Sequence, residues 1–157
     1  MDNSAIAATL GRIADLLEFK EENPFRVRSY RFAADIIADY PEQLAEVARR
    51  GGAQALQEIP GVGKAISGKI LELVETGGST FYQELTQEVP ESVLELTQVQ
   101  GIGPKTAHML FNEFGVTSLA TFEAFAEGGG LRLVRGLGDK SRQRILASVK
   151  RLRQNQA

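Results

Sequence analysis

The residues best suited to hold a ligand lie in three short segments of the form glycine, apolar residue, glycine. The segments are Gly61, Val62, Gly63; Gly101, Ile102, Gly103; and Gly136, Leu137, Gly138. Glycine permits a sharp turn, because a positive φ costs it little. A helical pattern follows each segment, and the first amide N–H groups of a helix have no intrahelical partner. These amides and the positive end of the helix dipole favour an anion such as a phosphate.

A lysine follows the second glycine of every segment by one or two residues, at Lys64, Lys105 and Lys140. A lysine there acts as a point charge beside oriented amides, which favours contacts with phosphate. For any one segment, a tight turn between helices without a ligand is an equally good interpretation. The repetition favours phosphate binding, and the pattern resembles the helix-hairpin-helix motif. That resemblance implies binding to DNA backbone without regard to base sequence.

Residues after the first glycine predict the helix of each hairpin. The residues nine places after it are apolar: Ile70, Leu110 and Ile145. The residues six places after it are Ser67, Ala107 and Arg142. A small residue there lets two helices cross closely, so we expect the helices of the third hairpin to cross less closely. We also expect valine at Gly103 to strain the second turn, since β-branched residues avoid positive φ.

Composition is that of an ordinary soluble globular protein, with 43% hydrophobic and 24% charged residues among 157. The absence of cysteine excludes disulfides and thiolate metal sites. No apolar run is long enough to span a membrane, and the N-terminus does not resemble a signal peptide, so we expect a cytoplasmic protein. The net charge of −2 excludes binding by overall positive charge. DNA binding must therefore be local, with a shallow dependence on salt.

The apolar pattern predicts an all-α fold, because helical spacing recurs throughout and a period of two persists nowhere. Glycines at residues 51–52 are expected to end a third helix, and a short helix over residues 53–58 leads into the first hairpin. Gly77 and Gly78 mark the best boundary inside the chain. We predict helical bundle domains over residues 1–78, with the first hairpin, and 79–157, with the other two.

Longer stretches carry a second resemblance. Residues 23–41 (NPFRVRSYRFAADIIADYP) joined to residues 59–77 (IPGVGKAISGKILELVETG) resemble the N-terminal, lyase-type domain of family X DNA polymerases. Residues 89–122 (VPESVLELTQVQGIGPKTAHMLFNEFGVTSLATF) resemble the next subdomain of that family, which grips duplex DNA. Residues 133–149 (LVRGLGDKSRQRILASV) match the third hairpin of bacterial members. The resemblance covers nearly the whole chain and implies a role in DNA repair or replication.

The residues of a polymerase active site are missing from this sequence. Family X enzymes hold metal ions on aspartates of a palm domain, whereas Asp139 is the last aspartate here. No pair of closely spaced carboxylates on a predicted strand is present to hold two Mg²⁺ ions. The His-rich phosphoesterase domain of bacterial members is also absent, since the chain has a single histidine. We expect a part of a longer polymerase or a free-standing relative, without polymerase activity of its own.

By register with the family, Lys69 falls where the lyase domain keeps its Schiff-base lysine. The implied reaction is attack of a neutral amine on the aldehyde of a 5′-deoxyribose phosphate, followed by β-elimination. Ala65 stands where a second lysine often helps, and Phe25 replaces a histidine. Glu72 is placed to form an ion pair with Lys69 and hold it protonated. The competing interpretation of Lys69 is an exposed helix lysine near a phosphate.

Arg26, Arg28 and Arg31 form a basic cluster on the helix predicted over residues 25–39. Such charges are often only a solvated face, and the alternative that the resemblance implies is a pocket for a 5′-phosphate. Tyr30 of the same helix matches the family.

The remaining basic and aromatic residues have structural interpretations. The tail is interpreted as a solubilising end or as charges that suit a helix C-terminus: Lys150, Arg151 and Arg153. His108 is treated as structural. Four aromatic residues at helical spacing are expected in the core: Phe111, Phe114, Phe122 and Phe125.

The resemblance also implies a monovalent cation, Na⁺ or K⁺, held at the hairpins by backbone carbonyls. The implied ligands are the carbonyls of Ile59, Val62, Thr97, Val99 and Ile102. We expect no side-chain metal site, no small-molecule substrate and no membrane. The expected partner is DNA, bound through its phosphates by a nucleoid-associated monomer. A helical protein-interaction domain is the remaining alternative.

Overall fold

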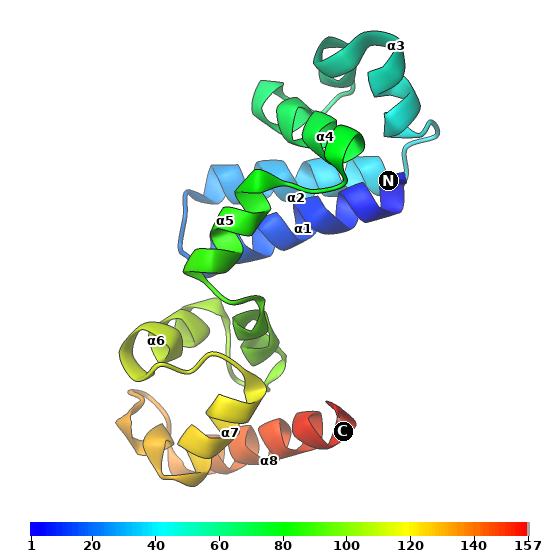
Figure 1. Ribbon diagram of the computed structural model, residues 1–157. Helices are drawn as coiled ribbons and strands as arrows, with labels where there is room; N and C mark the ends of the chain where they lie inside the picture. The colour runs from blue at the N-terminus through cyan, green and yellow to red at the C-terminus, as the bar shows by residue number, and fades with distance from the viewer. Residues whose placement is uncertain (157) are drawn as a thin grey trace. The chain divides into compact units, whose positions relative to one another are not determined.

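The computed structural model describes residues 1–156, which form helices joined by turns and contain no β-strand (Figure 1). The predicted all-α fold is therefore confirmed. Within this part of the chain, no helix combines the length and the apolar character needed to cross a membrane.

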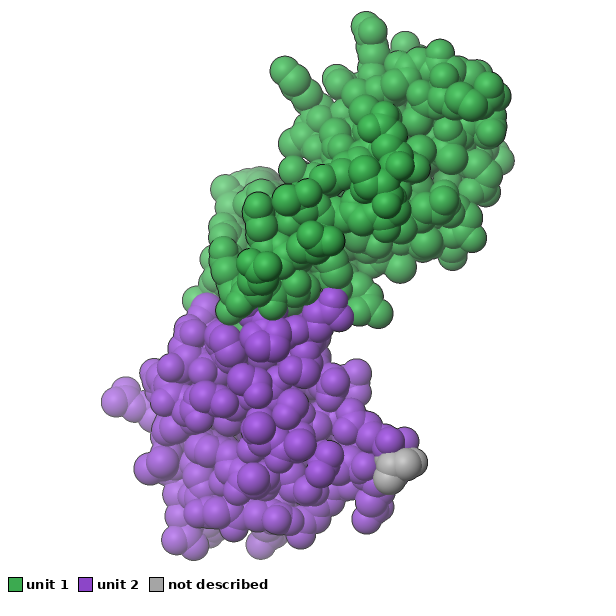
Figure 2. Space-filling view, in the orientation of Figure 1, with its two compact units in different colours: residues 1–88 green, residues 89–157 purple. Residues whose placement is uncertain are grey.

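The chain divides into two compact units, the first of which is Met1–Glu88 (Figure 2). The paired glycines predicted a division after Gly78. The two units instead divide after Glu88, because helix α5 (Thr80–Glu88) belongs to the first unit. Lys20 forms an ion pair with Glu88, which ties the end of α5 to the end of the first helix. The glycines before α5 thus mark the end of a helix within one unit.

Unit 1 is built on α1 (Asn3–Phe19) and α2 (Pro24–Ala38), which lie side by side (Figure 1). Helical spacing of apolar residues gives them a shared buried stripe that includes Ile6, Leu10, Ile13, Leu17 and Ile37. α3 (Leu44–Gln57) is interrupted at Gly52, where φ is 61° and ψ is −151°, as the paired glycines predict. α4 (Lys64–Thr76) follows the first hairpin.

A buried asparagine anchors the helix that leads into the first hairpin. The side-chain oxygen of Asn3 accepts from the amide of Leu44 at 2.8 Å, and its nitrogen donates to the carbonyl of Glu42 at 2.7 Å. The start of α3 has no cap from its own side chains, so Asn3 supplies one from α1.

Unit 2 contains, in chain order, η1 (Glu91–Gln98), α6 (Pro104–Phe114), α7 (Leu119–Glu127), η2 (Gly130–Leu133) and α8 (Asp139–Gln156). Its most deeply buried residues include Val93, Leu96, Leu110, Phe122 and Val149.

An aromatic cluster supports the α7–η2 corner of unit 2. The Phe125 ring lies with its centroid 5.0 Å from that of Phe114 and 6.4 Å from that of Phe122. Gly130 lies against the same ring, because a Cβ built on it would fall 2.4 Å from Phe125. Of the four phenylalanines expected in the core, only Phe122 is buried, whereas Phe111, Phe114 and Phe125 are half-buried.

Candidate nucleic-acid interface

The first two hairpins share one backbone geometry. Their first glycines, Gly61 and Gly101, have φ of 92° and 91°, in the region that side chains rarely adopt. In both, the amide of the apolar residue between the glycines donates to a carbonyl three residues earlier at 3.0 Å. The pairs are Val62 with Ile59 and Ile102 with Val99. Both apolar residues are only 4% exposed, so burial fixes the turn.

The second glycine of each hairpin has a different role from the first. Gly63 (φ −87°, ψ −176°) and Gly103 (φ −94°, ψ −179°) are extended, which any residue can adopt. The expected strain of a valine at Gly103 through positive φ is therefore wrong, because Gly101 carries the positive φ. A Cβ built on Gly63, Gly103 or Gly138 meets no described atom within 4 Å beyond its chain neighbours. The fold therefore does not require glycine at these three positions.

Each second glycine of the first two hairpins is an N-cap without a side-chain hydrogen bond. The first helical bonds run from Ser67 N to Gly63 O at 2.8 Å and from Ala107 N to Gly103 O at 2.9 Å. The amides between cap and first bond have no intrahelical acceptor and lie on an exposed turn. Pro104 has no N–H, so the second hairpin offers one amide fewer than the first.

The third hairpin keeps the turn but fills its surroundings with its own charges. Gly136 has a φ of 84°, but Leu137 is only half-buried. Arg142 stands where the other hairpins have buried Ser67 or Ala107, and its Nη1 donates to the Leu137 carbonyl at 2.8 Å.

The same guanidinium forms an ion pair with Asp139, the first residue of α8. The Asp139 side chain is 86% exposed and supplies the negative charge that a helix N-terminus favours. Lys140 follows on the exposed side. The third hairpin thus carries a carboxylate and a guanidinium at its helix start, whereas the helices of the first two hairpins begin with Lys64 and Pro104. The looser helix crossing expected there stays a prediction.

A cavity of about 500 Å³ lies beside the first hairpin, between α2 and the start of α4. Several residues singled out from the sequence line it: Arg26, Tyr30, Gly61, Gly63, Lys64 and Lys69. Burial raises the pKa of the Tyr30 hydroxyl, and the neighbouring Arg26 opposes that rise. The cavity therefore combines an open helix start with three cationic side chains.

The basic cluster of α2 is divided by the structure. Only Arg26 lines the cavity. Arg31 binds carboxylates of α1, with Asp15 at 2.7 Å and Glu18 at 3.4 Å. The Arg28 guanidinium lies 4.6 Å from the centroid of the exposed Phe25 ring. The sequence placed all three arginines on one helix, but their partners come from different neighbours.

Phe81 of α5 is the site residue that the sequence did not reveal. The Arg26 guanidinium lies 4.9 Å and the Lys69 ammonium 5.1 Å from its ring centroid. Tyr30 stacks on the same ring, with centroids 6.2 Å apart. The residues around Phe81 in the sequence do not predict these contacts, because its partners belong to α2 and α4.

Glu72 does not take the role expected for it beside Lys69. Its two carboxylate oxygens accept from the amide of Thr80 at 3.0 Å and from its hydroxyl at 2.7 Å. These bonds lower the pKa of Glu72, and Lys69 acts on it only as a weaker electrostatic influence. Glu72 therefore joins α4 to α5 instead of neutralising Lys69.

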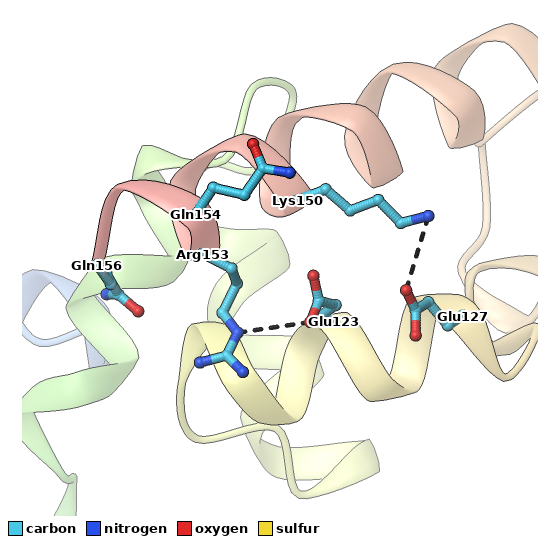
Figure 3. Close-up of a pocket in the computed structure, with 6 residues that line it drawn as sticks. All are labelled: Glu123, Glu127, Lys150, Arg153, Gln154 and Gln156. Carbon is cyan, nitrogen blue, oxygen red and sulfur yellow. Dashed lines mark hydrogen bonds and ion pairs between the residues drawn. The ribbon is translucent and has the colours of Figure 1, made fainter.

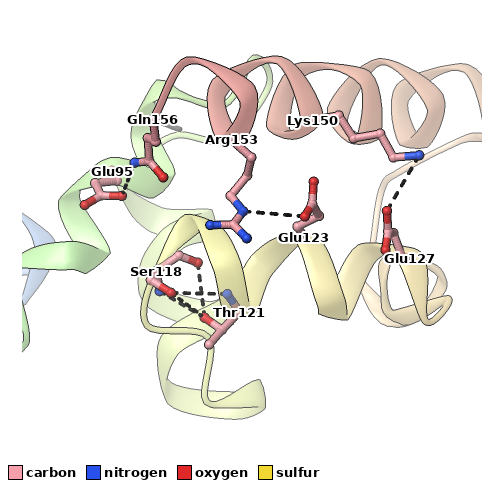
Figure 4. A network of polar contacts seen from close by, with 8 residues as sticks. All are labelled: Glu95, Ser118, Thr121, Glu123, Glu127, Lys150, Arg153 and Gln156. Atoms are coloured by element: carbon pink, nitrogen blue, oxygen red, sulfur yellow. Dashed lines mark hydrogen bonds and ion pairs between the residues drawn. The ribbon is translucent and has the colours of Figure 1, made fainter.

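The basic residues near the C-terminus bind acidic residues of α7. Lys150 pairs with Glu127 at 3.6 Å, and Arg153 pairs with Glu123 at 3.5 Å (Figure 3). Gln156 donates to Glu95 at 2.9 Å (Figure 4).

A cavity of about 610 Å³ lies among these side chains, but both of its cations already have carboxylate partners. Figure 4 also shows the capping box of Ser118 and Thr121 that begins α7. This region holds α8 on α7 and is poorly suited to an anion.

Two known domain families match separate parts of the chain. The helix-hairpin-helix domain family matches residues 1–79, and the family described as a SAM-like helix-hairpin-helix tandem matches residues 93–151.

Relatives of two kinds are similar to the chain. The DNA polymerase/3'-5' exonuclease PolX of Bacillus subtilis is 29% identical over 149 residues, which are 95% of this chain and 25% of PolX. The Holliday junction branch migration complex subunit RuvA of an Acidovorax species is 30% identical over 92 residues, 59% of this chain and 48% of RuvA. RuvA of Porphyromonas gingivalis is 30% identical over 81 residues, 52% of this chain and 40% of RuvA.

The chain thus spans a quarter of the length of PolX and less than half of the RuvA relatives. The resemblance to family X DNA polymerases is confirmed over nearly the whole chain. One family match covers half of the chain and contains the hairpin whose open helix start borders the cationic cavity. The chain belongs to the helix-hairpin-helix domain family.

Proposed function

We propose that this chain is a DNA-binding module that holds backbone phosphates at its first two hairpins, without reading bases, in DNA repair or replication. The observation that carries the proposal is the second glycine of each hairpin. Gly63 and Gly103 are extended and have open space where a side chain would point. A phosphate oxygen seated on the amides of a helix start needs that space. The matched families and the names of the relatives are those of proteins that handle DNA.

The charge balance of the chain shapes how such binding works. Backbone amides attract a phosphate without adding net charge, so a chain of net charge −2 can still bind DNA locally. Counterion release follows the number of cationic side chains at phosphates. With Arg26, Lys64, Lys69 and Lys105 as the main contacts, log Kd should change with log salt by a slope of roughly 3 to 4. A protein that bound by overall positive charge would show a much steeper slope.

The cavity beside the first hairpin favours a strand end at a gap or nick. Arg26, Lys64 and Lys69 line it together with the α4 helix start. A terminal phosphate monoester carries about −1.5 to −2 charges at neutral pH, more than a phosphodiester. Three cations around one open helix start suit that larger charge better than an internal phosphate.

Fluorescence anisotropy with labelled duplexes tests the proposal. The chain is titrated with intact, nicked and gapped DNA of two unrelated base sequences, at two salt concentrations. We expect tighter binding to gapped than to intact DNA and equal binding to both sequences. Absence of binding at low salt would instead favour the protein-interaction alternative. Strong preference for one base sequence would contradict backbone recognition.

A lyase reaction at Lys69 is a second candidate, favoured by the position of Lys69 in the cavity with Arg26 and Tyr30. In that reaction the neutral amine adds to C1′ of the aldehyde and water leaves, which forms an imine. Loss of a C2′ proton then breaks the C3′–O bond and frees a DNA strand with a 5′-phosphate. Hydrolysis of the imine restores the lysine and releases the unsaturated sugar phosphate.

Borohydride reduction on DNA with a 5′-deoxyribose phosphate separates the lyase from a binding module. We expect weak trapping or none, because the cavity has Ala65 where a second lysine would help. Strong trapping that Lys69→Ala removes, with DNA affinity retained, would establish the lyase. Trapping that survives the substitution would point to Lys64.

A monovalent cation at the hairpin carbonyls is also proposed. Ile59 and Val99 each accept one amide bond in their turns, and a carbonyl oxygen has a second lone pair. At the third hairpin, the Arg142 guanidinium already lies at the Leu137 carbonyl. These carbonyls would seat Na⁺ or K⁺ beside the phosphate site. Affinity for gapped DNA should then be higher in K⁺ or Na⁺ than in a bulky organic cation at equal ionic strength.

A further inference from the structure

Three side chains that line the first-hairpin cavity converge on one ring outside it. Arg26 and Lys69 place their charged groups 4.9 Å and 5.1 Å from the Phe81 centroid, and Tyr30 stacks on the ring at 6.2 Å. Phe81 belongs to α5 and lies beyond the residues of the first family match. A cation over an aromatic face is attracted by the ring quadrupole.

A ring and a carboxylate hold a cation with different consequences. Arg31, on the same helix as Arg26, is held by Asp15 and Glu18, which neutralise its charge. A phenylalanine ring restrains a guanidinium or ammonium group but carries no net charge. Arg26 and Lys69 therefore keep their full positive charge for an incoming phosphate.

The ring itself is fixed by the neighbouring residue. Thr80 donates its amide and hydroxyl to Glu72 of α4, one turn after Lys69. Ser79 caps the start of α5 by accepting from the Tyr82 amide at 3.2 Å. These bonds set Phe81 against α4, so the two cations are held before a ligand arrives. Long side chains ordered in advance lose less entropy on binding.

We propose that Phe81 is a positioning residue, which aims Arg26 and Lys69 together at the terminal 5′-phosphate of a gapped DNA strand. This inference rests on the proposed binding of a terminal phosphate, and what it adds is the role of Phe81. Phe81 does not touch the phosphate in this account; it acts through the two cations.

The test compares gapped duplexes that differ only in a 5′-phosphate or a 5′-hydroxyl at the gap. The quantity measured is the ratio of the two dissociation constants, for the wild type and four variants. Phe81→Leu and Phe81→Met keep an apolar side chain, and Phe81→Tyr keeps the ring. Tyr82→Leu is the matched control, because Tyr82 is also a half-buried aromatic residue of α5.

We expect Phe81→Leu and Phe81→Met to lower the preference for phosphate by roughly fivefold, the size of one exposed cation–π contact. Phe81→Tyr and Tyr82→Leu should keep the wild-type ratio.

A ratio that stays unchanged in both the Phe81→Leu and Phe81→Met variants would overturn the proposal. An equal loss of the preference in Phe81→Tyr would also overturn it. So would a wild type that binds both ends equally, although backbone binding would then stand. Failure to bind either DNA would instead remove the proposed function itself. Thermal unfolding by circular dichroism identifies any variant whose fold has changed.

Discussion

The first two hairpins and the third carry the same glycine pattern but present different surfaces to a phosphate. In the first two, an extended second glycine leads into an uncapped helix over a buried Ser67 or Ala107. In the third, Asp139 begins the helix and Arg142 binds both Asp139 and the Leu137 carbonyl. A shared turn therefore does not imply a shared ligand. The residues directly after the turn decide whether the helix start stays open.

The largest difference between hairpins should follow substitution of the second glycine. Gly63→Ala or Gly103→Ala should weaken binding to gapped DNA about tenfold, because a methyl group in an occupied seat costs roughly 1–3 kcal/mol. Gly138→Ala should change affinity little, since the Asp139 carboxylate already repels a phosphate at that helix start. Anisotropy titrations measure all three. Alanine at these N-caps should cost stability less than about 1 kcal/mol, which urea unfolding checks.

If Gly138→Ala weakens binding as much as the other two substitutions, the third hairpin binds phosphate as the first two do, and the proposed difference between hairpins is wrong. A matched control is Gly101→Ala, which targets the positive φ of 91°. That variant should lose stability because the backbone is strained. Stability and affinity are thus expected to separate between the two glycines of one hairpin.

The lysines should differ in their effect on salt dependence. Lys64→Ala and Lys105→Ala should each reduce the slope of log Kd against log salt by about 1, as expected for one lost phosphate contact. Lys140→Ala should leave the slope unchanged. Titrations at four salt concentrations measure the slopes. Equal losses at all three lysines would show that the third hairpin contacts phosphate after all.

The smallest effect is expected from opening the third hairpin. The double variant Asp139→Lys, Arg142→Ser gives it the residues of the first hairpin at both places. We expect affinity for gapped DNA to rise severalfold, with log Kd more dependent on salt by about one contact. Arg142→Ser alone should cost about 1 kcal/mol of stability through its lost hydrogen bonds without raising affinity. If the double variant binds no better than wild type, Asp139 and Arg142 are not what closes this hairpin.

The turns and helices could be predicted from the sequence because they depend on local residue types. Glycine spacing placed the hairpins, and helical periodicity placed the buried apolar residues. The division between units was not predicted, because it depends on the contacts of α5 with α1 and not on Gly77 and Gly78 before it. The sequence analysis also expected a positive φ at Gly103, whereas Gly101 has it, since residue type alone does not reveal φ.

The side-chain partners of the candidate site could not be predicted for a related reason. Arg31 meets Asp15 and Glu18 from the preceding helix, and Phe81 meets residues of α2 and α4. Such contacts depend on how helices pack. Helical spacing predicted a Lys69–Glu72 pair, but Thr80 offers Glu72 two donors and takes its place.

The most direct test of the central claim is an amide nuclear magnetic resonance titration of the ¹⁵N-labelled chain with gapped DNA. We expect large shifts for the amides of residues 63–66 and for Gly103, Lys105 and Thr106, where the helix starts are open. The amides of residues 138–141 should move little, because the Asp139 carboxylate disfavours a phosphate at that helix start. Equal shifts at all three hairpins, or shifts confined to the third, would contradict the account.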